Sequence, residues 1–258
     1  MLTERRIAHA RTWDARHCQE ATLSDLAIDL FTLTYRPNAV DWETLEADDR
    51  PLKYQLASLR FFDLKADCPT NAGVLTFGKD PRYFFPGAFV QYVQYAGDSQ
   101  ADDILQERRL GGELLGVLRD LKRLTQEVAE GRPVSDPAQS DRMVFDYPPK
   151  AMHELFMNAV VHRNYEGSTS PILVSHYPNR IEIQNPGGLF GELTPEQFRR
   201  GTAYRNPILA EAAKVLGFVN RFGRGISIIE SELQRNGSRP AEFDLQPNHF
   251  LAIVWRRP

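Results

Sequence analysis

Cysteine is scarce in this chain of 258 residues, which contains only Cys18 and Cys68. The two residues form neither a CxxC pair nor a cluster, so the sequence indicates no zinc site and no disulfide framework, and it favours a reducing compartment. Long apolar runs are also missing, since no stretch approaches the roughly 20 residues that a membrane span needs. The N-terminal residues Met1–Arg6 lack the apolar segment of a signal peptide. We therefore expect a cytoplasmic protein without membrane contacts.

A strong charge of one sign is absent as well. The formal net charge is −3 and the sequence pI is about 6.1, which excludes a strongly basic nucleic-acid footprint over the whole chain. No Gly-x-x-x-x-Gly-Lys-Ser/Thr motif occurs, so a P-loop helicase motor is excluded too. Hydrophobic residues make up 42% and charged residues 25%, which is typical of a soluble globular protein with a sizeable core.

The order of the sequence patterns predicts an α+β protein with two domains. Residues 1–20 are charged and are expected to form an N-terminal arm, followed by a smaller α/β domain at 21–130. The segment 131–141 contains glycine, proline, serine and aspartate, which is typical of a linker. Residues 142–258 then form the C-terminal domain, for which we predict a two-layer α/β sandwich.

Apolar periodicity predicts the elements of both domains. In the first domain we expect strands at Val74–Phe77 and Phe89–Tyr95, a turn at Thr70–Gly73 and a helix at 112–129. In the second we expect helices at Pro149–His162, Thr194–Arg200, Pro207–Leu216 and Ile226–Gln234, and strands at Arg142–Asp146, Ile172–Tyr177, Arg180–Gln184, Phe243–Leu245 and Phe250–Trp255.

The helix at 149–162 carries a polar stripe. Glu154, Asn158 and His162 are four residues apart, so their side chains lie along one slowly drifting face of the helix. A helix that borders a cleft and a helix with a solvated face explain this stripe about equally well. His153-Glu154 begins like a zinc-protease motif, but Met157 occupies the position of the second histidine, which argues against zinc.

Two glycine-bearing turns follow the helix in the sequence. Asn185-Pro-Gly-Gly188 ends a predicted strand, and Arg221-Phe-Gly-Arg-Gly225 precedes a predicted helix. Glycines at alternate positions let backbone N–H groups approach a phosphate, and the start of a helix favours negative charge. A turn that needs positive φ is the simpler explanation for each of them alone. Arg205-Asn-Pro207 lies between them and is a candidate charged element near phosphates.

Together these segments resemble a known family. The relevant sequences are Glu154-Leu-Phe-Met-Asn-Ala-Val-Val-His-Arg-Asn-Tyr165, Ile181-Glu-Ile-Gln-Asn-Pro-Gly-Gly-Leu189, Arg205-Asn-Pro-Ile-Leu-Ala210 and Arg221-Phe-Gly-Arg-Gly-Ile226. The order of these segments is similar to that in the GHKL (Bergerat-like) ATP-binding fold. Their amino-acid sequences are similar to those of the RecG-related C-terminal domain of transcriptional regulators. In those proteins the domain usually follows a Schlafen-type AlbA domain, and this chain begins after the point where such a domain ends. Trp13–Arg16 and Thr70–Gly78 also resemble the connecting region of those proteins.

The resemblance implies a role for each matching residue. Asn158 corresponds to the Mg²⁺ ligand and Glu154 to the residue that activates water in the hydrolysing members. Asn185 stands where most members have the aspartate that reads the adenine amino group, and Leu189 replaces the last glycine of the usual pattern, so adenine specificity stays open. The remaining candidates for nucleotide contacts are His162, Gly187, Gly188, Arg205, Asn206, Gly223 and Gly225.

The function implied is that of an ATP-binding module of a transcriptional regulator, with Mg²⁺ and ATP as cofactors and slow or no hydrolysis, so a weak ATPase activity is conceivable. The alternative is a DNA-associated regulatory or dimerisation module with a degenerate nucleotide site. For that alternative, DNA is contacted through a preceding domain or by Arg5, Arg6, Arg11 and Arg16 of the arm, although a solvated arm is the simpler explanation. A homodimer is compatible with both hypotheses.

Overall fold

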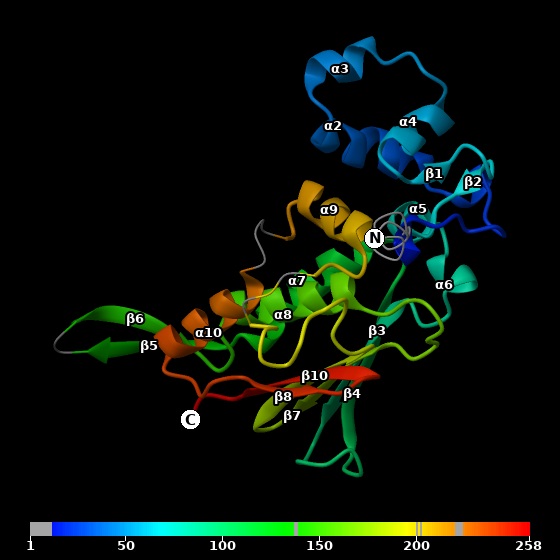
Figure 1. Cartoon of the computed structure of the whole chain (residues 1–258). Helices are drawn as coiled ribbons and strands as arrows, with labels where there is room; N and C mark the ends of the chain where they lie inside the picture. Colours follow the sequence, from blue (N-terminus) through cyan, green and yellow to red (C-terminus); the bar gives the residue numbers. More distant parts are fainter. Residues whose placement is uncertain (1–11, 137–138, 200, 202, 220–223) are drawn as a thin grey trace.

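The structure is a computed structural model that describes residues 12–136, 139–199, 201, 203–219 and 224–258. A six-stranded sheet with helices packed on one side forms the main body, and a smaller helical region lies at one end (Figure 1). This arrangement confirms the predicted α+β class. None of the described helices is both long enough and apolar enough to cross a membrane.

The elements are as follows. The helices are α2 (Arg36–Ala39), α3 (Trp42–Ala47), α4 (Leu52–Ser58), α5 (Asn71–Phe77), α6 (Pro81–Phe84), α7 (Leu114–Val128), α8 (Pro149–His162), α9 (Pro207–Val215) and α10 (Gly225–Asn236), with short 3-10 turns η1 (Trp13–Ala15) and η2 (Leu23–Asp25) and a π-helical segment η3 (Leu30–Tyr35). The strands are β1 (Phe62–Asp63), β2 (Cys68–Pro69), β3 (Phe89–Tyr95), β4 (Ile104–Gly111), β5 (Gly131–Asp136), β6 (Gln139–Phe145), β7 (Ile172–Tyr177), β8 (Arg180–Pro186), β9 (Glu242–Leu245) and β10 (His249–Trp255).

The large sheet has the order β4-β3-β7-β8-β10-β9, in which only β3 and β7 pair in parallel. Alternation along each strand explains why one face is covered. In β8, Ile181, Ile183 and Asn185 are buried, while Gln184 between the last two is exposed. The neighbouring strands continue the apolar face, because Val174 of β7 and Ala252 of β10 both pair with Ile183.

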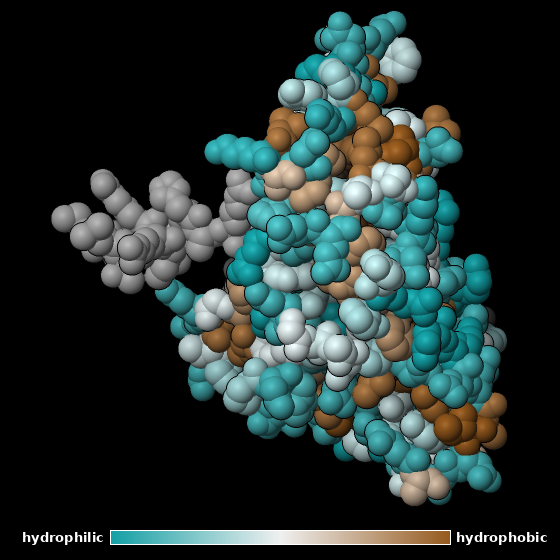
Figure 2. Space-filling view, turned by 90° about the vertical axis from the view of Figure 1, so that its right-hand side faces the viewer, coloured by the Kyte–Doolittle hydropathy of each residue, from teal (hydrophilic) through white to brown (hydrophobic). Residues whose placement is uncertain are grey.

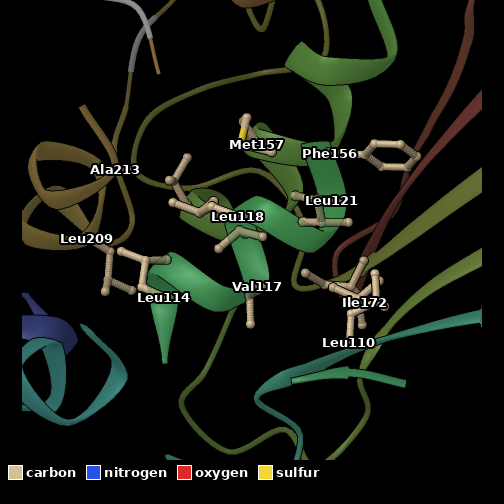
Figure 3. Packing of buried hydrophobic residues seen from close by; sticks show 14 of the residues in the cluster. Leu110, Leu114, Val117, Leu118, Leu121, Phe156, Met157, Ile172, Leu209 and Ala213 are labelled. Carbon is tan, nitrogen blue, oxygen red and sulfur yellow. The ribbon is translucent and has the colours of Figure 1, made fainter. Parts of the chain in front are cut away.

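Helices α7, α8 and α10 lie over this apolar face (Figure 1). Leu114, Leu118 and Leu121 of α7 are spaced three to four residues apart. In Figure 3, Leu118 and Leu121 lie on the side of α7 that faces Met157 and Phe156 of α8, and Leu114 lies beside Leu209 of α9. Each of these side chains is almost completely buried. Burying such a side chain contributes roughly 1.5–3 kcal/mol to the free energy of unfolding. This layer therefore fixes the position of α8 on the sheet.

The sheet takes strands from both sides of the segment expected to be a linker. β3 and β4 precede residues 131–141, and β7 to β10 follow them. The described residues of this segment belong to β5 and β6, which pair antiparallel from Gly131 opposite Phe145. The division into separately folding domains therefore stays a prediction, and it has to account for one sheet that both parts share.

The predicted strand at Val74–Phe77 is wrong, because these residues belong to helix α5. Thr70 starts the helix, since its hydroxyl oxygen accepts a hydrogen bond from the Gly73 backbone N–H at 3.1 Å. The whole helix is buried, which explains why its short apolar run carried no helical periodicity. Gly73 is required by packing, because a Cβ there would lie 2.2 Å from the backbone oxygen of Phe61. The expected turn at 70–73 is accordingly the first turn of α5.

The segment predicted as a helix at Thr194–Arg200 forms turns over 195–199, and residue 200 lies outside the described residues. Its backbone still bonds in a helical manner at the start, since the Phe198 N–H donates to the Thr194 carbonyl at 3.0 Å. The predicted helices at 149–162, 207–216 and 226–234 and the four strands from 172 to 255 are confirmed within one to three residues.

The described part of the N-terminal arm packs against the C-terminal half. The Asp14 side chain is completely buried, and its carboxylate accepts hydrogen bonds from the backbone N–H groups of Ile208 at 2.7 Å and Leu209 at 3.3 Å, at the start of α9. Burial raises the pKa of the Asp14 carboxyl. Arg16 pairs with Glu166 at 2.6 Å. The arginines expected as DNA contacts at 5, 6 and 11 lie outside the described residues.

Exposed apolar side chains concentrate in the small helical region. Leu33 is 76% exposed and Trp42 is 71% exposed. Figure 2, which shows the right-hand side of Figure 1, has hydrophobic atoms at the height of α2 to α4 and a second hydrophobic group near the bottom right, with a mostly hydrophilic surface between them. Exposed apolar surface of this kind is compatible with a partner, and the homodimer stays a prediction.

Candidate functional site

A cavity of about 160 Å³ lies between helix α8, the end of β8, the first turn of α10 and the segment 187–204. Glu154, Asn158 and His162 line it along one side. The stripe seen in the sequence therefore borders a cavity instead of open solvent. Leu155, on the same helix, also contributes to the lining, so the wall alternates polar and apolar groups. Such a mostly apolar cavity with a few polar groups is typical of small-molecule sites.

Helix α8 holds the stripe in place because its other faces are buried. The helix begins at Pro149, where proline fits since the first N–H of a helix needs no intrahelical partner. Phe156, Met157 and Val160 are at most 3% exposed and fix the rotation of the helix on the sheet. Glu154 is buried and Asn158 is partly exposed, and among the described residues neither side chain has a hydrogen-bond partner.

The first turn of α10 touches the α8 stripe directly. A Cβ added to Gly225 would lie 2.8 Å from the Asn158 Nδ2 and 3.3 Å from the Glu154 Oε2. Gly225 is the first residue of α10. The backbone N–H groups of the first turn, which have no intrahelical partner, therefore lie beside the Asn158 amide and the Glu154 carboxylate. Gly223, expected in the same loop, lies outside the described residues. Glycine at 225 is explained by this close approach to α8.

Asn185 lies at the other side of the cavity, near the end of β8. Its Nδ2 donates a hydrogen bond to the Ala159 backbone oxygen at 3.0 Å, which ties β8 to α8. Its Oδ1 is buried and has no hydrogen-bond partner among the described residues. The residue is 5% exposed and lines the cavity. A buried acceptor without a partner costs free energy, and a ligand that donates a hydrogen bond would remove this cost.

The turn after β8 fixes the rim beside Asn185. Gly187 adopts a φ of +93°, which favours glycine, and its N–H donates to the Asn248 backbone oxygen at 2.8 Å. The Gly188 N–H donates to the Pro247 oxygen at 3.2 Å, and a Cβ on Gly188 would lie 2.3 Å from the backbone oxygen of Gln246. Both glycines are therefore required for the turn to lie against the β9–β10 connection.

Arg205 and Asn206 do not line the cavity but stabilise its walls. The Arg205 Nη2 donates to the Gly188 backbone oxygen at 3.0 Å, and its guanidinium lies 4.8 Å from the centre of the Phe190 ring. Asn206 is 1% exposed, and its Nδ2 donates to the Val161 oxygen at 3.0 Å and to the Arg163 oxygen at 2.8 Å. Asn206 thereby satisfies carbonyl groups at the C-terminal end of α8.

His162 ends the stripe beside an aromatic ring. Its imidazole stacks on Tyr204, with ring centroids 5.6 Å apart and 12° between the planes. Burial, followed by the positive charge of Arg205, lowers the pKa of His162 from its ordinary value of 6.5 to about 4. The side chain is therefore neutral at pH 7 and offers a flat, uncharged surface to the cavity.

Several lining residues escaped the sequence analysis. Tyr204, Phe190, Phe198 and Phe250 supply aromatic walls from the loop and from β10. The only sequence signal for them is the density of aromatic residues around the glycine turn, because loop residues follow no helical or strand period. His153 lies outside the cavity, and its Nε2 is 2.8 Å from the Phe218 backbone oxygen. Among the described residues, no group of three or more His, Cys, Asp and Glu side chains could hold a metal ion on its own.

Comparison with known proteins gives a matching family model and similar solved structures. Residues 169–254 match the model of a family described as "Putative ATP-dependent DNA helicase recG C-terminal", which supports a relationship with that family. The matched segment begins after α8 and includes Asn185 and Gly225. No curated protein matches the chain.

The fold is similar to the crystal structure of the DIP2311 protein from Corynebacterium diphtheriae, with a TM-score of 0.71 and 20% sequence identity. The likeness covers 99% of this chain and 50% of that one, so the chain spans about half the length of its structural relative. At this identity the comparison establishes the fold alone.

Proposed function

We propose that the cavity beside α8 binds an adenine nucleotide together with Mg²⁺, and that the chain acts as a nucleotide-binding module with slow or no hydrolysis. The observation that carries the proposal is the contact between Gly225 and the pair Glu154 and Asn158. It brings a helix N-terminus, an amide and a carboxylate together at one cavity whose other walls are largely apolar. The family matched by residues 169–254 supports the same assignment.

The Asn185 side of the cavity fits a base. One N–H of the Asn185 amide donates to the Ala159 oxygen, and the buried Oδ1, which has no partner among the described residues, can accept a hydrogen bond from a ligand. Adenine presents an amino group at this edge, whereas guanine presents an oxygen. A cavity of about 150 Å³ admits a benzene-sized ring, so a cavity of about 160 Å³ is sufficient for the flat part of a ligand.

The Gly225 side fits phosphates and a magnesium ion. The first N–H groups of α10 lack intrahelical partners and favour a negative group, as at other helix starts. Asn158 offers an amide oxygen, which Mg²⁺ accepts when phosphates and waters complete its octahedral shell. Few protein ligands are then needed, in agreement with the small number of acidic groups at this site. When bound, the ion would neutralise charge on the phosphates.

Glu154 is the residue placed to act as a base. Its carboxylate is buried, lines the cavity and lies next to the first turn of α10. A carboxylate without a hydrogen-bond partner can accept a proton from water, which is the general-base role. We propose this role only for a slow reaction, because no second acid or base lines this end of the cavity among the described residues.

Titration calorimetry with Mg-ATP on the purified chain tests the binding. We expect binding that requires Mg²⁺ and that is at least tenfold tighter for ATP than for GTP, because guanine would leave the Asn185 Oδ1 facing another acceptor. Asn158→Ala should abolish the Mg²⁺-dependent part of the affinity while the fold is unchanged. Asn38→Ala is the matched control, since Asn38 is an exposed amide on α2, far from the cavity in the sequence and outside its lining. A folded protein that binds no Mg-ATP at millimolar concentration refutes the proposal.

Glu154→Gln separates binding from hydrolysis. The substitution keeps the shape and a hydrogen-bonding oxygen but removes the basic carboxylate. We expect unchanged nucleotide affinity and loss of any phosphate release measured with the wild-type chain. Equal turnover in the two proteins would exclude Glu154 as the base.

The wider role is that of a transcriptional regulator in which nucleotide binding changes how a DNA-binding part is presented. The similarity to the RecG C-terminal family and the half-length coverage of the structural relative support a module that works together with another part. DNA binding by a preceding domain, and a homodimer, belong to this proposal. Light scattering with and without Mg-ATP measures the oligomeric state directly.

A further inference from the structure

Arg163 is a buried cation outside the nucleotide cavity. Its side chain is 1% exposed and follows α8 directly in the chain. The Nη2 donates to two backbone oxygens, that of Ser170 at 2.6 Å and that of Ser168 at 3.3 Å. Its Nε and Nη1 are buried without a hydrogen-bond partner among the described residues. Three of the five N–H groups of the guanidinium are therefore unsatisfied.

The surroundings of Arg163 provide no negative charge. Its guanidinium lies 4.5 Å from the centre of the Tyr165 ring, which gives a cation–π contact. No carboxylate of the described residues forms an ion pair with it. Burial lowers the pKa of Arg163, yet an arginine in a protein keeps its proton. A buried charge of this kind is usually paired, because water is no longer available to solvate it.

The position of Arg163 is built into the fold. A Cβ on Gly87 would lie 2.4 Å from the Arg163 Nη2, so glycine at this position makes room for the guanidinium. Tyr165 is held from both sides, since its hydroxyl donates to the Val160 oxygen at 2.9 Å and its ring stacks on Trp13 with centroids 5.8 Å apart. The guanidinium is thus a fixed component of the core rather than a side chain folded in by chance.

A small cavity lies beside these residues. It has a volume of about 20 Å³ and is lined by Arg163, Tyr165 and apolar side chains, among them Leu114, Val117 and Ile172, which Figure 3 labels. A space of roughly 10–15 Å³ by this measure holds one water molecule. The cavity therefore accommodates one particle of solvent size, and it is too small for a phosphate, a nucleotide or a peptide side chain.

We propose that this cavity is a binding site for a monatomic anion of the chloride class, held by the Nε and Nη1 of Arg163. A single such ion matches the volume of the cavity, accepts hydrogen bonds from the unsatisfied N–H groups of Arg163 and supplies the missing negative charge. A water molecule would fill the space but leave the charge unpaired. Because Arg163 follows His162 and its carbonyl oxygen accepts a hydrogen bond from Asn206, the ion also holds the C-terminal end of α8 at the nucleotide cavity.

Crystals of the full chain grown or soaked in bromide test the site directly. We expect one anomalous peak within hydrogen-bonding distance of the Arg163 Nε or Nη1 in the 20 Å³ cavity. Peaks confined to the surface, or a water molecule in the cavity in the presence of bromide, would overturn the proposal.

Stability in solution gives the second measurement. Urea denaturation in sodium chloride and in sodium methanesulfonate at equal ionic strength should give a higher midpoint in chloride, rising with the logarithm of its concentration as for a ligand that binds only the folded state. Arg163→Met keeps an unbranched stem and removes the donors, so this dependence should disappear. Arg123→Gln, at an exposed arginine of α7, is the control that should keep it. Equal midpoints of the wild-type chain in both salts would refute the site, and this result decides even if the Arg163 variant does not fold.

Discussion

Lowering the pH from 7 to 5 should destabilise the protein through His162. The pKa of this histidine falls from 6.5 to about 4 on folding because the side chain is buried and lies near Arg205. The folded state then binds fewer protons than the unfolded state between these two values. The contribution of His162 to the free energy of unfolding is therefore fully present above pH 6.5. It decreases as the pH falls and is lost once the pH is below the pKa of the folded state.

The magnitude follows from the same two values. At pH 5 the unfolded histidine is largely protonated and the folded one is largely neutral, so the difference approaches 1.5 pH units, or about 2 kcal/mol at 1.36 kcal/mol per unit. This is the largest contribution that the two pKa values of His162 allow at pH 5. His176 contributes in the same direction, since burial and then Arg256 lower its pKa to about 4 as well. A variant is needed to separate the two histidines.

Urea denaturation of the wild-type chain and of His162→Gln, each at pH 7 and pH 5, isolates this contribution. The wild type should lose about 1–2 kcal/mol more than the variant between the two pH values, because the variant lacks the His162 contribution and keeps that of His176. His249→Gln serves as a control at an exposed position of β10 that does not line the cavity. If His162→Gln and the wild type show the same loss, His162 does not have the lowered pKa in solution.

Two further substitutions test the walls of the cavity. Gly225→Ala should weaken Mg-nucleotide binding at least tenfold in calorimetry, because the new Cβ would lie 2.8 Å from the Asn158 amide nitrogen. The urea midpoint should stay the same or rise, because alanine favours helices. An unchanged nucleotide affinity would contradict the contact between Gly225 and Asn158. Asn206→Ala should cost about 1–3 kcal/mol of unfolding free energy, because the Val161 and Arg163 carbonyl groups lose a buried donor. An unchanged urea midpoint for that variant would mean that water replaces the amide.

The parts of the fold that sequence reasoning predicted are those that local patterns specify. Helix α8 was predicted from a proline start and a continuous apolar face, and it spans Pro149–His162 as expected. Strands β7 and β8 follow from alternation around the turn at residues 178–179. In contrast, Asn71–Phe77 became a helix because it is buried on all sides, and its short apolar run is compatible with either kind of element.

The parallel pairing of β3 with β7 could not be predicted from the sequence. These strands are separated by α7, the β5–β6 hairpin and α8, and no local signal states which strand pairs with which. The glycine and proline content of 131–141 resembled that of a linker, although the same residues fit a hairpin. Pairing between distant strands depends on how the apolar faces of all helices and strands pack together. Local periodicity in the sequence does not specify this packing.

The candidate site shows the same limit at the level of single residues. Asn185 and Asn206 look alike in the sequence, since each is an asparagine followed by proline beside a glycine turn or a helix start. The structure gives them different surroundings, because Asn185 lines the cavity and Asn206 does not. Both side chains donate to backbone oxygens of α8, and both have a buried Oδ1 without a hydrogen-bond partner among the described residues. Substituting Asn185 should therefore change which base is preferred, whereas substituting Asn206 should change the stability of α8 and act on every nucleotide equally. Residue type and order located both positions near the site, and only their place relative to the cavity separates contact with the ligand from support of the wall.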